Sequence, residues 1–287
     1  MRAIKFNANT KSKVSSLIMK FYPMMTFVLV KKLFKYKDIK LNGKRLSSDE
    51  TACEGDEICF YVQDNFFNLD IIFEDENILI VNKPRKIEVT STQNESLEKM
   101  ILSQLKIKVF AVHRLDINTT GLVIFSKNEQ TKAELDKAFK LRTIEKYYYA
   151  LVLGTDLSET CDLVSYLKKD DLSGKVKISD TPKAGYEKIQ TKYKLLKTFS
   201  NFSLVEVELL TGKTHQIRAH FAHICHPVLG DEKYGDFNTN SMMNLKYQCL
   251  CAERIVFHFE KGSPLFYLDK KEVALSQEKI DFLKYCK

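Results

Sequence analysis

The sequence lacks several features that would place it in specialised classes of protein. Its 287 residues include only ten glycines and five prolines, which excludes collagen-like chains and chains dominated by linkers. No stretch approaches the ~20 apolar residues that a membrane span needs, and residues 1–10 contain no apolar signal-peptide core. The seven cysteines form no Cys-x-x-Cys pair, so we expect reduced thiols in a cytoplasmic protein.

Common motifs for bound nucleotides and metals are also missing. There is no Gly-x-Gly-x-x-Gly, no Gly-x-x-x-x-Gly-Lys-Ser/Thr and no His-Glu-x-x-His. The sequence therefore predicts neither a dinucleotide site nor a P-loop.

The residues that are present can form a core, and the charge is unevenly placed. Apolar residues make up 44% of the chain and aromatic residues 11%. Residues 1–48 contain twelve lysines or arginines and one acid, Asp38, a net charge of +11 against +8 for the whole chain, so the rest carries −3. This asymmetry is typical of a polyanion-binding module joined to another domain, although a solvated lysine-rich surface would give the same count.

The first 62 residues are predicted to form a small α/β domain. Apolar periodicity predicts helices over 12–20 and 26–37, separated by Pro23. A strand from Asp38 runs into an Asn42-Gly43 turn, and a second strand covers 57–62. Residues 63–69 are predicted to be a linker.

This order of elements resembles the RNA-binding domain named after ribosomal protein S-four. The matching segments are 38–45, Asp-Ile-Lys-Leu-Asn-Gly-Lys-Arg, and 54–58, Glu-Gly-Asp-Glu-Ile. The resemblance implies that the helix and hairpin faces bind structured RNA. The candidate contacts are Lys31, Lys35, Lys44 and Arg45.

Residues 70–287 are predicted to form an α+β domain with a mixed, mostly antiparallel sheet. A hairpin is expected from 69–73 and 78–82, and helices are expected over 95–106, capped by Asn94, and 129–141, capped by Asn128. Further strands are predicted at 108–112, 121–126, 146–153, 175–178, 187–196, 202–209 and 254–259. Because strands come in adjacent pairs with few helices between them, antiparallel pairing should dominate.

A polar block lies between two apolar strands in the segment 112–127. Its members are His113, Arg114, Asp116, Asn118, Thr119 and Thr120. Such a loop can be ordinary turn chemistry, with Asp116 and Thr119 bonding nearby amides. The alternative is a catalytic carboxylate with a fixed arginine beside it.

Two later segments are also rich in polar or aromatic side chains. In the strand 146–153, Tyr148 faces away from Tyr147 and Tyr149, and a packed aromatic strand would explain most of this pattern. In the segment 209–231, the spacing of Ile217, Phe221 and Ile224 predicts a short helix with a buried stripe. Thr214 could cap that helix, and Arg218 lies off the stripe, where it can reach a carboxylate.

Four of the six histidines lie in this last segment: His215, His220, His223 and His226. The pair His220 and His223 has a spacing that could hold a metal. No known metal motif fits the cluster, so hydrogen bonding near the helix end is the favoured role, and no metal site is predicted.

Together and in this order, these segments resemble the RluA-type pseudouridine synthases. The resemblance covers about residues 70–260. Its motifs are His-Arg-Leu-Asp-x-x-Thr-Thr-Gly-Leu at 113–122, Lys-x-Tyr-x-Ala at 146–150, Thr-Gly-Lys-Thr-His-Gln-Ile-Arg-x-His at 211–220, His-Pro-Val-Leu-Gly-Asp at 226–231 and Asp-Glu-Asn-Ile-Leu-Ile-Val-Asn-Lys-Pro at 75–84.

The resemblance implies an isomerase that converts uridine in RNA to pseudouridine. The bond from ribose carbon one to uracil nitrogen breaks, the base rotates, and a carbon–carbon bond forms. The reaction is redox-neutral, so no cofactor is expected. Large-subunit ribosomal RNA is the expected substrate, with transfer RNA as the alternative, and the protein is expected to be a monomer.

Residue by residue, the resemblance makes Asp116 the essential carboxylate, which either attacks ribose carbon one or removes a proton from the neighbouring carbon. Tyr148 would stack on the uracil, Arg218 would pair with Asp116 and keep it ionised, and Arg114 would hold the flipped nucleotide. Further predicted RNA contacts are His113, Thr119, Lys146, Lys213, His215 and Gln216.

Two departures from the family pattern concern the third segment. Lys213 replaces the usual arginine, which keeps the charge but loses the planar fork. Cys225 stands where glycine is usual, at a cost of about 1 kcal/mol if its backbone is left-handed. Two other functions remain as alternatives: a non-catalytic RNA-binding or ribosome-assembly protein, and a metal-dependent hydrolase built on the histidines.

Overall fold

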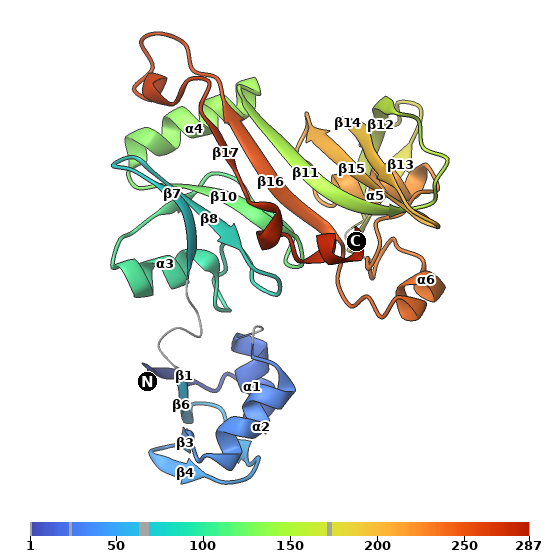
Figure 1. Cartoon of the computed structure of the whole chain (residues 1–287). Coiled ribbons are helices and arrows are strands. Elements are labelled where there is room, and N and C mark those ends of the chain that lie inside the picture. The colour runs from blue at the N-terminus through green and yellow to red at the C-terminus, as the bar shows by residue number, and fades with distance from the viewer. Residues whose placement is uncertain (1, 23–24, 63–68, 171–173, 287) are drawn as a thin grey trace. The chain divides into compact units, whose positions relative to one another are not determined.

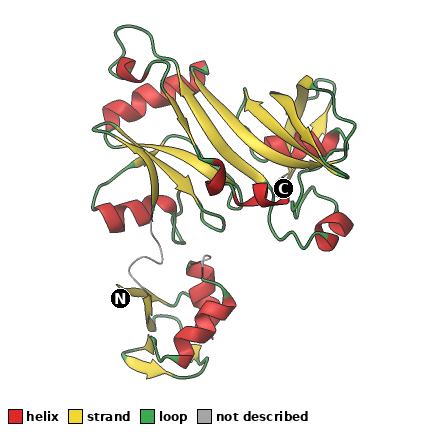
Figure 2. Ribbon diagram, in the orientation of Figure 1, coloured by secondary structure: helices red, strands yellow, loops and turns green. Residues whose placement is uncertain are grey.

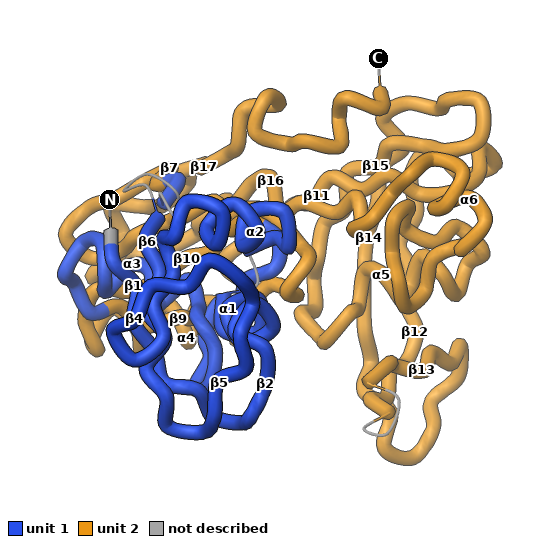
Figure 3. Tube along the Cα trace, turned by 90° about the horizontal axis from the view of Figure 1, so that it is seen from below, with its two compact units in different colours: residues 1–70, 85–108 blue, residues 71–84, 109–287 orange. Residues whose placement is uncertain are grey.

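The structure is a computed structural model that describes residues 2–22, 25–62, 69–170 and 174–286 (Figure 1). The chain forms two compact units. Unit 1 contains Met1–Asp70 and Arg85–Lys108, and unit 2 contains Ile71–Pro84 and Val109–Lys287 (Figure 3). Pro23, the predicted separator of two helices, and positions 63–68 of the predicted linker lie outside the described residues.

Unit 1 contains a four-stranded antiparallel sheet, two N-terminal helices and a third helix from its second segment. The elements are β1 Arg2–Asn7, β2 Ser12–Lys13, α1 Val14–Phe21, α2 Phe27–Lys35, β3 Ile39–Leu41, β4 Lys44–Leu46, β5 Thr51–Ala52, β6 Glu57–Val62 and α3 Leu97–Leu105. The sheet order is β1-β6-β3-β4. Strand β1 was not predicted, because Ile4 and Phe6 give too short an apolar alternation to signal a strand.

The predicted helix and hairpin of the basic segment are both present. Thr26 caps α2 by accepting a hydrogen bond from the Leu29 N–H. Asn42 and Gly43 both have positive φ, 47° and 81°, as a tight two-residue hairpin turn requires. The candidate RNA contacts of this unit are all exposed: Lys31, Lys35, Lys44 and Arg45.

Residues 85–108 share a hydrophobic core with the N-terminal helices of unit 1. Ile87 and Met100 belong to the same buried cluster as Val14 and Ile18. Helix α3 begins at Leu97 and is capped by Ser96, whose hydroxyl accepts from the Lys99 N–H. The predicted cap at Asn94 is therefore wrong, because the extended backbone that a cap needs occurs two residues later.

Unit 2 is an α+β fold around one large sheet (Figure 2). Its strands are β7 Asp70–Glu74, β8 Ile78–Lys83, β9 Phe110–Ala111, β10 Thr120–Ser126, β11 Ile144–Leu153, β12 Thr160–Asp170, β13 Lys175–Ser179, β14 Glu187–Thr198, β15 Phe202–Leu209, β16 Leu250–Phe257 and β17 Glu272–Ala274. Its helices are α4 Glu129–Leu141, α5 Gln216–His223 and α6 Phe237–Met242, with short 3₁₀ turns at Phe266–Leu268, Gln277–Lys279 and Asp281–Cys286.

The sheet has the order β13-β12-β14-β15-β11-β16-β10-β8-β7, with β9 beside β10 and β17 beside β16. The registered pairings are antiparallel except for β10 with β16, which confirms the predicted mixed, mostly antiparallel sheet. Strands β12 and β17 and helix α6 were not predicted. In strand β12 an apolar residue, Val164, is exposed and a polar one, Ser165, is buried, so its apolar signal is weak.

Strand β16 brings two distant motifs together. Ala252 pairs with Gly121 of β10 on one side and with Tyr148 of β11 on the other. Gly121 has φ 113°, and a Cβ there would lie 2.2 Å from the Ala252 carbonyl oxygen, so only glycine allows this approach. The loop 113–119, which precedes Gly121, is thereby held next to Tyr148.

Among the described residues, no helix has the length and apolar character needed to cross a membrane.

Candidate active site

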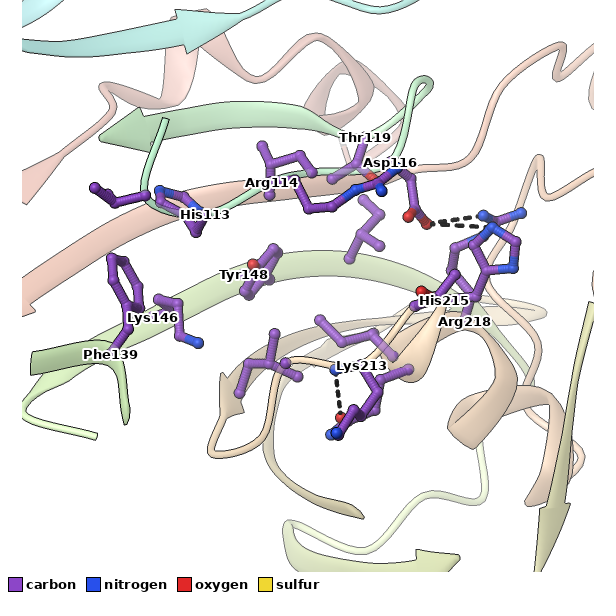
Figure 4. Close-up of a pocket in the computed structure, with 18 residues that line it drawn as sticks. His113, Arg114, Asp116, Thr119, Phe139, Lys146, Tyr148, Lys213, His215 and Arg218 are labelled. Atoms are coloured by element: carbon purple, nitrogen blue, oxygen red, sulfur yellow. Dashed lines mark hydrogen bonds and ion pairs between the residues drawn. The ribbon is translucent and has the colours of Figure 1, made fainter. Parts of the chain in front are cut away.

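The three segments singled out in the sequence line one cavity of about 350 Å³ in unit 2, which we call the main cavity (Figure 4). Asp116, His215 and Arg218 lie at one end, His113, Phe139 and Lys146 at the other, and Tyr148 between them. The lining residues are Val112, His113, Arg114, Leu115, Asp116, Thr119, Phe139, Lys146, Tyr148, Leu209, Gly212, Lys213, Thr214, His215, Gln216, Ile217, Arg218 and Leu250.

Arg218 connects two carboxylates at the first end of the cavity. Its Nε and Nη2 donate to Asp231 Oδ2 and Oδ1 at 2.6 and 2.9 Å, a bidentate pair. Its Nη1 donates to Asp116 Oδ2 at 2.8 Å. Arg218 is 5% exposed and Asp231 1%, whereas 20% of the Asp116 side chain is exposed, so the outer carboxylate alone can meet a substrate.

The opposite charges in this group stabilise the ionised forms of Arg218 and Asp231. Burial alone would lower the pKa of Arg218, but the hydrogen bonds and charges of Asp231 and Asp116 raise it above its usual value. Burial would raise the pKa of Asp231, but the hydrogen bond and charge of Arg218 hold it below its usual value. The guanidinium is therefore a permanent cation beside Asp116.

Helix α5 presents Arg218 without the predicted cap. The residue before the helix, His215, has a left-handed backbone with φ 54°, and it makes no side-chain cap. Instead Gln216 Oε1 accepts from the Thr211 hydroxyl at 2.9 Å and from the Lys213 N–H at 3.1 Å. The prediction of Thr214 as cap was wrong, because the first side chain of the helix bonds back to the turn.

The buried stripe of α5 is largely as predicted. Ile217 and Phe221 are buried at 4% and 0% exposure, while Ile224 lies just beyond the helix and is half-buried. Arg218, off this stripe, reaches Asp116 as the sequence suggested.

The loop that carries Asp116 is held by hydrogen bonds within the loop and from buried side chains. The Asp116 carbonyl accepts from the Thr119 N–H at 3.0 Å, and the buried Thr119 hydroxyl accepts from Gln248 Nε2 at 2.6 Å. The fully buried Lys83 donates to the Ile117 carbonyl at 3.0 Å. The bonds that hold this loop are thus made by the Asp116 and Ile117 carbonyls and by Thr119. The Asp116 carboxylate itself accepts from Arg218.

Tyr148 faces the main cavity from β11. Its side chain is 5% exposed, and burial, with the charge of Asp116, raises its pKa well above the usual value for tyrosine. Tyr147 lies on the opposite face, where its hydroxyl donates to Glu145 at 2.8 Å and its ring lies 3.8 Å from the Arg254 guanidinium carbon. The alternation of faces follows the prediction, and Tyr148 is a protonated phenol at neutral pH.

The other end of the main cavity is basic and aromatic. His113 Nε2 accepts from the Ile124 N–H at 2.9 Å, and burial, with the charge of Lys146, lowers its pKa to about 3, so it is neutral. The Lys146 ammonium lies 5.5 Å from the centre of the Phe139 ring. Burial, with the charge of Arg142, lowers the pKa of Lys146 to about 8.

The remaining predicted contacts differ in how accessible they are. Arg114 is exposed at the cavity, whereas Gln216 is 2% exposed and its amide donates to the Gln190 carbonyl and the Thr191 hydroxyl. Lys213 is ion-paired with Glu187. His215 Nδ1 lies 2.9 Å from the Tyr234 hydroxyl, and its Nε2 lies 4.0 Å from Asp116 Oδ2.

The histidines do not gather around one point. His220 Nδ1 lies 3.0 Å from the Thr191 hydroxyl, His223 Nε2 lies 2.7 Å from Asp180, and His226 Nδ1 lies 2.8 Å from the Leu153 carbonyl. In the part of the chain that the structure describes, no group of three or more histidine, cysteine or acidic residues could hold a metal.

Sequence reasoning did not assign a role to Asp231 or Tyr234. Asp231 was only the last residue of a motif, and nothing in its spacing predicts the pair with Arg218. Tyr234 accepts from the Val176 N–H at 2.8 Å and contacts both His215 and Arg218. Only the fold brings these residues to the site.

Comparisons with known proteins show the family of the chain. The family model described as RNA pseudouridylate synthase matches residues 77–223. An uncharacterized RNA pseudouridine synthase of Mycoplasma capricolum is 34% identical over 271 residues, covering 85% of this chain and 87% of that protein. Ribosomal large subunit pseudouridine synthase C of Rickettsia bellii is 31% identical over 283 residues, covering 88% and 92%.

A solved structure shows the same fold. Human RNA Pseudouridylate Synthase Domain Containing 1 has a TM-score of 0.58 at 21% identity, covering 77% of this chain and 96% of that one.

The fold and the matched motifs define an enzyme that isomerises uridine in RNA. The chain belongs to the RNA pseudouridine synthase family, and the resemblance to its RluA type is confirmed.

Proposed function

We propose that the protein converts uridine to pseudouridine in large-subunit ribosomal RNA, with Asp116 as the catalytic carboxylate and without a cofactor. The observation that carries the proposal is the chain of contacts from Asp231 through Arg218 to Asp116. The buried bidentate pair fixes the guanidinium, and the guanidinium fixes a partly exposed carboxylate inside a cavity. Cleavage of a glycosidic bond by a carboxylate is established chemistry in enzymes.

The reaction can be written with the residues of the cavity. A uridine flipped out of the RNA enters the cavity, and Asp116 attacks ribose carbon one or removes a proton from carbon two. The carbon–nitrogen bond breaks and leaves a uracil anion, which rotates and joins ribose carbon one through its carbon five. On the first route the bond from Asp116 to carbon one breaks as the new bond forms, and on the second route Asp116 returns its proton to carbon two. The proton on carbon five is then lost and nitrogen one gains a proton, so atoms and charge balance.

Arg218 and Tyr148 support different parts of this reaction. Arg218 donates to Asp116 and orients it, which an attacking carboxylate requires. The Tyr148 phenol, protonated before reaction, can stack on the uracil and exchange a proton with the base as negative charge develops there. Arg114, exposed beside Asp116, can hold the flipped nucleotide.

The choice of ribosomal RNA rests on the names of relatives and on the basic N-terminal unit. Relatives named for the ribosomal large subunit cover most of the chain, and the exposed cations of unit 1 suit a structured polyanion.

Pseudouridine mapping of ribosomal and transfer RNA from cells with and without the gene tests this choice. Loss of one or more pseudouridines from large-subunit RNA is expected. Loss from transfer RNA alone would assign the other substrate, and an unchanged map would contradict the proposal.

A further inference from the structure

A second cavity of about 380 Å³ adjoins the main cavity, and we call it the side cavity. The two cavities share a wall of five residues: Phe139, Lys146, Leu209, Gly212 and Lys213. The other residues of the side cavity are Lys140, Arg142, Ile144, Glu145, Glu208, Leu210 and Thr211. It therefore adjoins the main cavity along a wall that includes Phe139 and Lys146.

The side cavity holds more cations than its carboxylates neutralise. Its lining has four basic side chains and two acids. Glu145 already accepts from the Tyr147 hydroxyl at 2.8 Å and lies 3.1 Å from His258 Nε2. Lys213 is ion-paired with Glu187 outside the cavity. This leaves the cations of 140, 142 and 146, none of which has an ion pair within the described ranges of the chain, against one remaining carboxylate of the lining, Glu208.

Of these three cations, Lys146 would be stabilised most by a bound anion. It is withdrawn from solvent and faces Phe139 at 5.5 Å, and its neighbour Arg142 adds a like charge. The pKa of Lys146 falls to about 8 as a result. Lys146 is half-buried, and a partly desolvated cation without a counter-ion is costly, so a negatively charged ligand would stabilise this site.

We infer that the side cavity binds a phosphodiester of the RNA strand adjacent to the target uridine, held by Lys146 from the shared wall and by Arg142 from the rim. This inference rests on the proposed function. One backbone phosphate carries one negative charge, and an arginine fork with a lysine point charge is a common way to hold it. Because the cavities share Lys146, a strand with one base in the main cavity can place a neighbouring phosphate here.

The test pairs a protein change with an RNA change. A synthetic RNA that contains the mapped uridine is prepared with one neutral methylphosphonate linkage at each position flanking the target, one position per RNA. The wild type, Arg142→Gln and the control Lys137→Gln are compared by kcat/KM. Lys137 is an exposed lysine of the same helix region that lines neither cavity.

On unmodified RNA, Arg142→Gln should lower kcat/KM roughly tenfold through KM, as expected for a lost charge-assisted hydrogen bond, whereas Lys137→Gln should change it less than about twofold. At one linkage, the neutral substitution should lower the kcat/KM of the wild type. The same RNA should lower the kcat/KM of Arg142→Gln little further, since the two changes remove the same contact.

The inference would be overturned if the losses of kcat/KM from the protein change and the RNA change were additive at every linkage. It would also be overturned if Arg142→Gln had the same kcat/KM as Lys137→Gln. Product formation by the wild type on unmodified RNA tests the proposed function separately. Normal turnover by the wild type without coupling between Arg142→Gln and any neutral linkage would therefore reject only the role of the side cavity. Thermal unfolding of each variant checks that the fold is retained.

Discussion

Arg218 divides its donors between a buried carboxylate and a partly exposed one, and this division is the central feature at the scale of single residues. Asp231, which also accepts from the backbone N–H groups of Lys233 and Tyr234, holds the guanidinium in one orientation. A third donor, on Nη1, is directed at Asp116. The site thus depends on the planar shape of arginine as well as its charge.

We predict that Arg218→Lys lowers single-turnover pseudouridine formation about 100-fold, because a misplaced carboxylate loses its alignment with the ribose. An ammonium can carry the charge but cannot bond both carboxylates in the same plane. Arg254→Lys is the matched control, since Arg254 bonds Glu206 at 2.9 Å but lines neither cavity. Equal activity of Arg218→Lys and the control would contradict the role given to the guanidinium.

We predict that Lys146 makes RNA binding sensitive to alkaline pH. Its pKa of about 8 lies below the usual lysine value, so between pH 7 and 9 the free enzyme loses this charge. His113, with a pKa of about 3, is neutral throughout this range. A bound phosphate favours the protonated form, so affinity for RNA should fall about tenfold over this range. Filter binding at several pH values measures this affinity.

Lys146→Met is the comparison for this prediction. The variant should bind more weakly at pH 7 and show a flatter profile, because the titrating group is gone. A profile as steep as that of the wild type would assign the pH dependence to another group.

Individual elements show which parts of the fold could be predicted. Helix α4 has the predicted bounds, 129–141, and the predicted Asn128 cap, because a long amphipathic helix carries many periodic residues. The strand β1 and the cap of α3 were missed or misplaced, because each depends on one or two residues. The pair Arg218–Asp231 and the side cavity could not be predicted, since they join residues that meet only when the sheet forms.

The end of helix α5 contains a residue under backbone strain. Cys225 follows the helix with φ 65°, a left-handed conformation in which glycine is favoured. The resemblance to the family implies that glycine is usual at this position. We predict that Cys225→Gly raises the free energy of unfolding by about 1 kcal/mol, as measured by urea denaturation.

Cys225→Ala is the control, because it removes the thiol but keeps the Cβ that causes the strain. It should leave the free energy of unfolding nearly unchanged. Destabilisation by the glycine variant would show that the unfolded chain gains more from glycine than the native turn does.

At the scale of the whole molecule, positive charge is concentrated in one compact unit. Residues 1–48 carry +11, but unit 1 as a whole carries +6 and unit 2 carries +2, because seven acids lie between residues 49 and 70. Unit 1 also includes residues 85–108, which contribute Ile87 and Met100 to its core. Deletion of residues 1–62 would expose that core. Substitution of surface charges is therefore the sounder way to test the unit.

We predict that replacing four exposed cations of unit 1 by glutamine lowers RNA affinity and makes it less salt-dependent. The slope of log K against log salt should fall by up to about three, since each phosphate contact contributes about 0.7 to 0.9. The four residues are Lys31, Lys35, Lys44 and Arg45. The control replaces four exposed lysines of unit 2, Lys137, Lys192, Lys194 and Lys261, and an equal change of slope in both variants would remove the special role of unit 1.

The most direct test of the account is the product yield of Asp116→Asn. Asparagine keeps the size of the side chain and removes its charge, while Arg218 keeps its bidentate pair with Asp231. In single-turnover reactions with saturating enzyme and an RNA that contains the mapped uridine, we predict no detectable pseudouridine and an RNA Kd within about threefold of the wild type. Pseudouridine formed at the wild-type rate would contradict the assignment of Asp116 as the catalytic carboxylate.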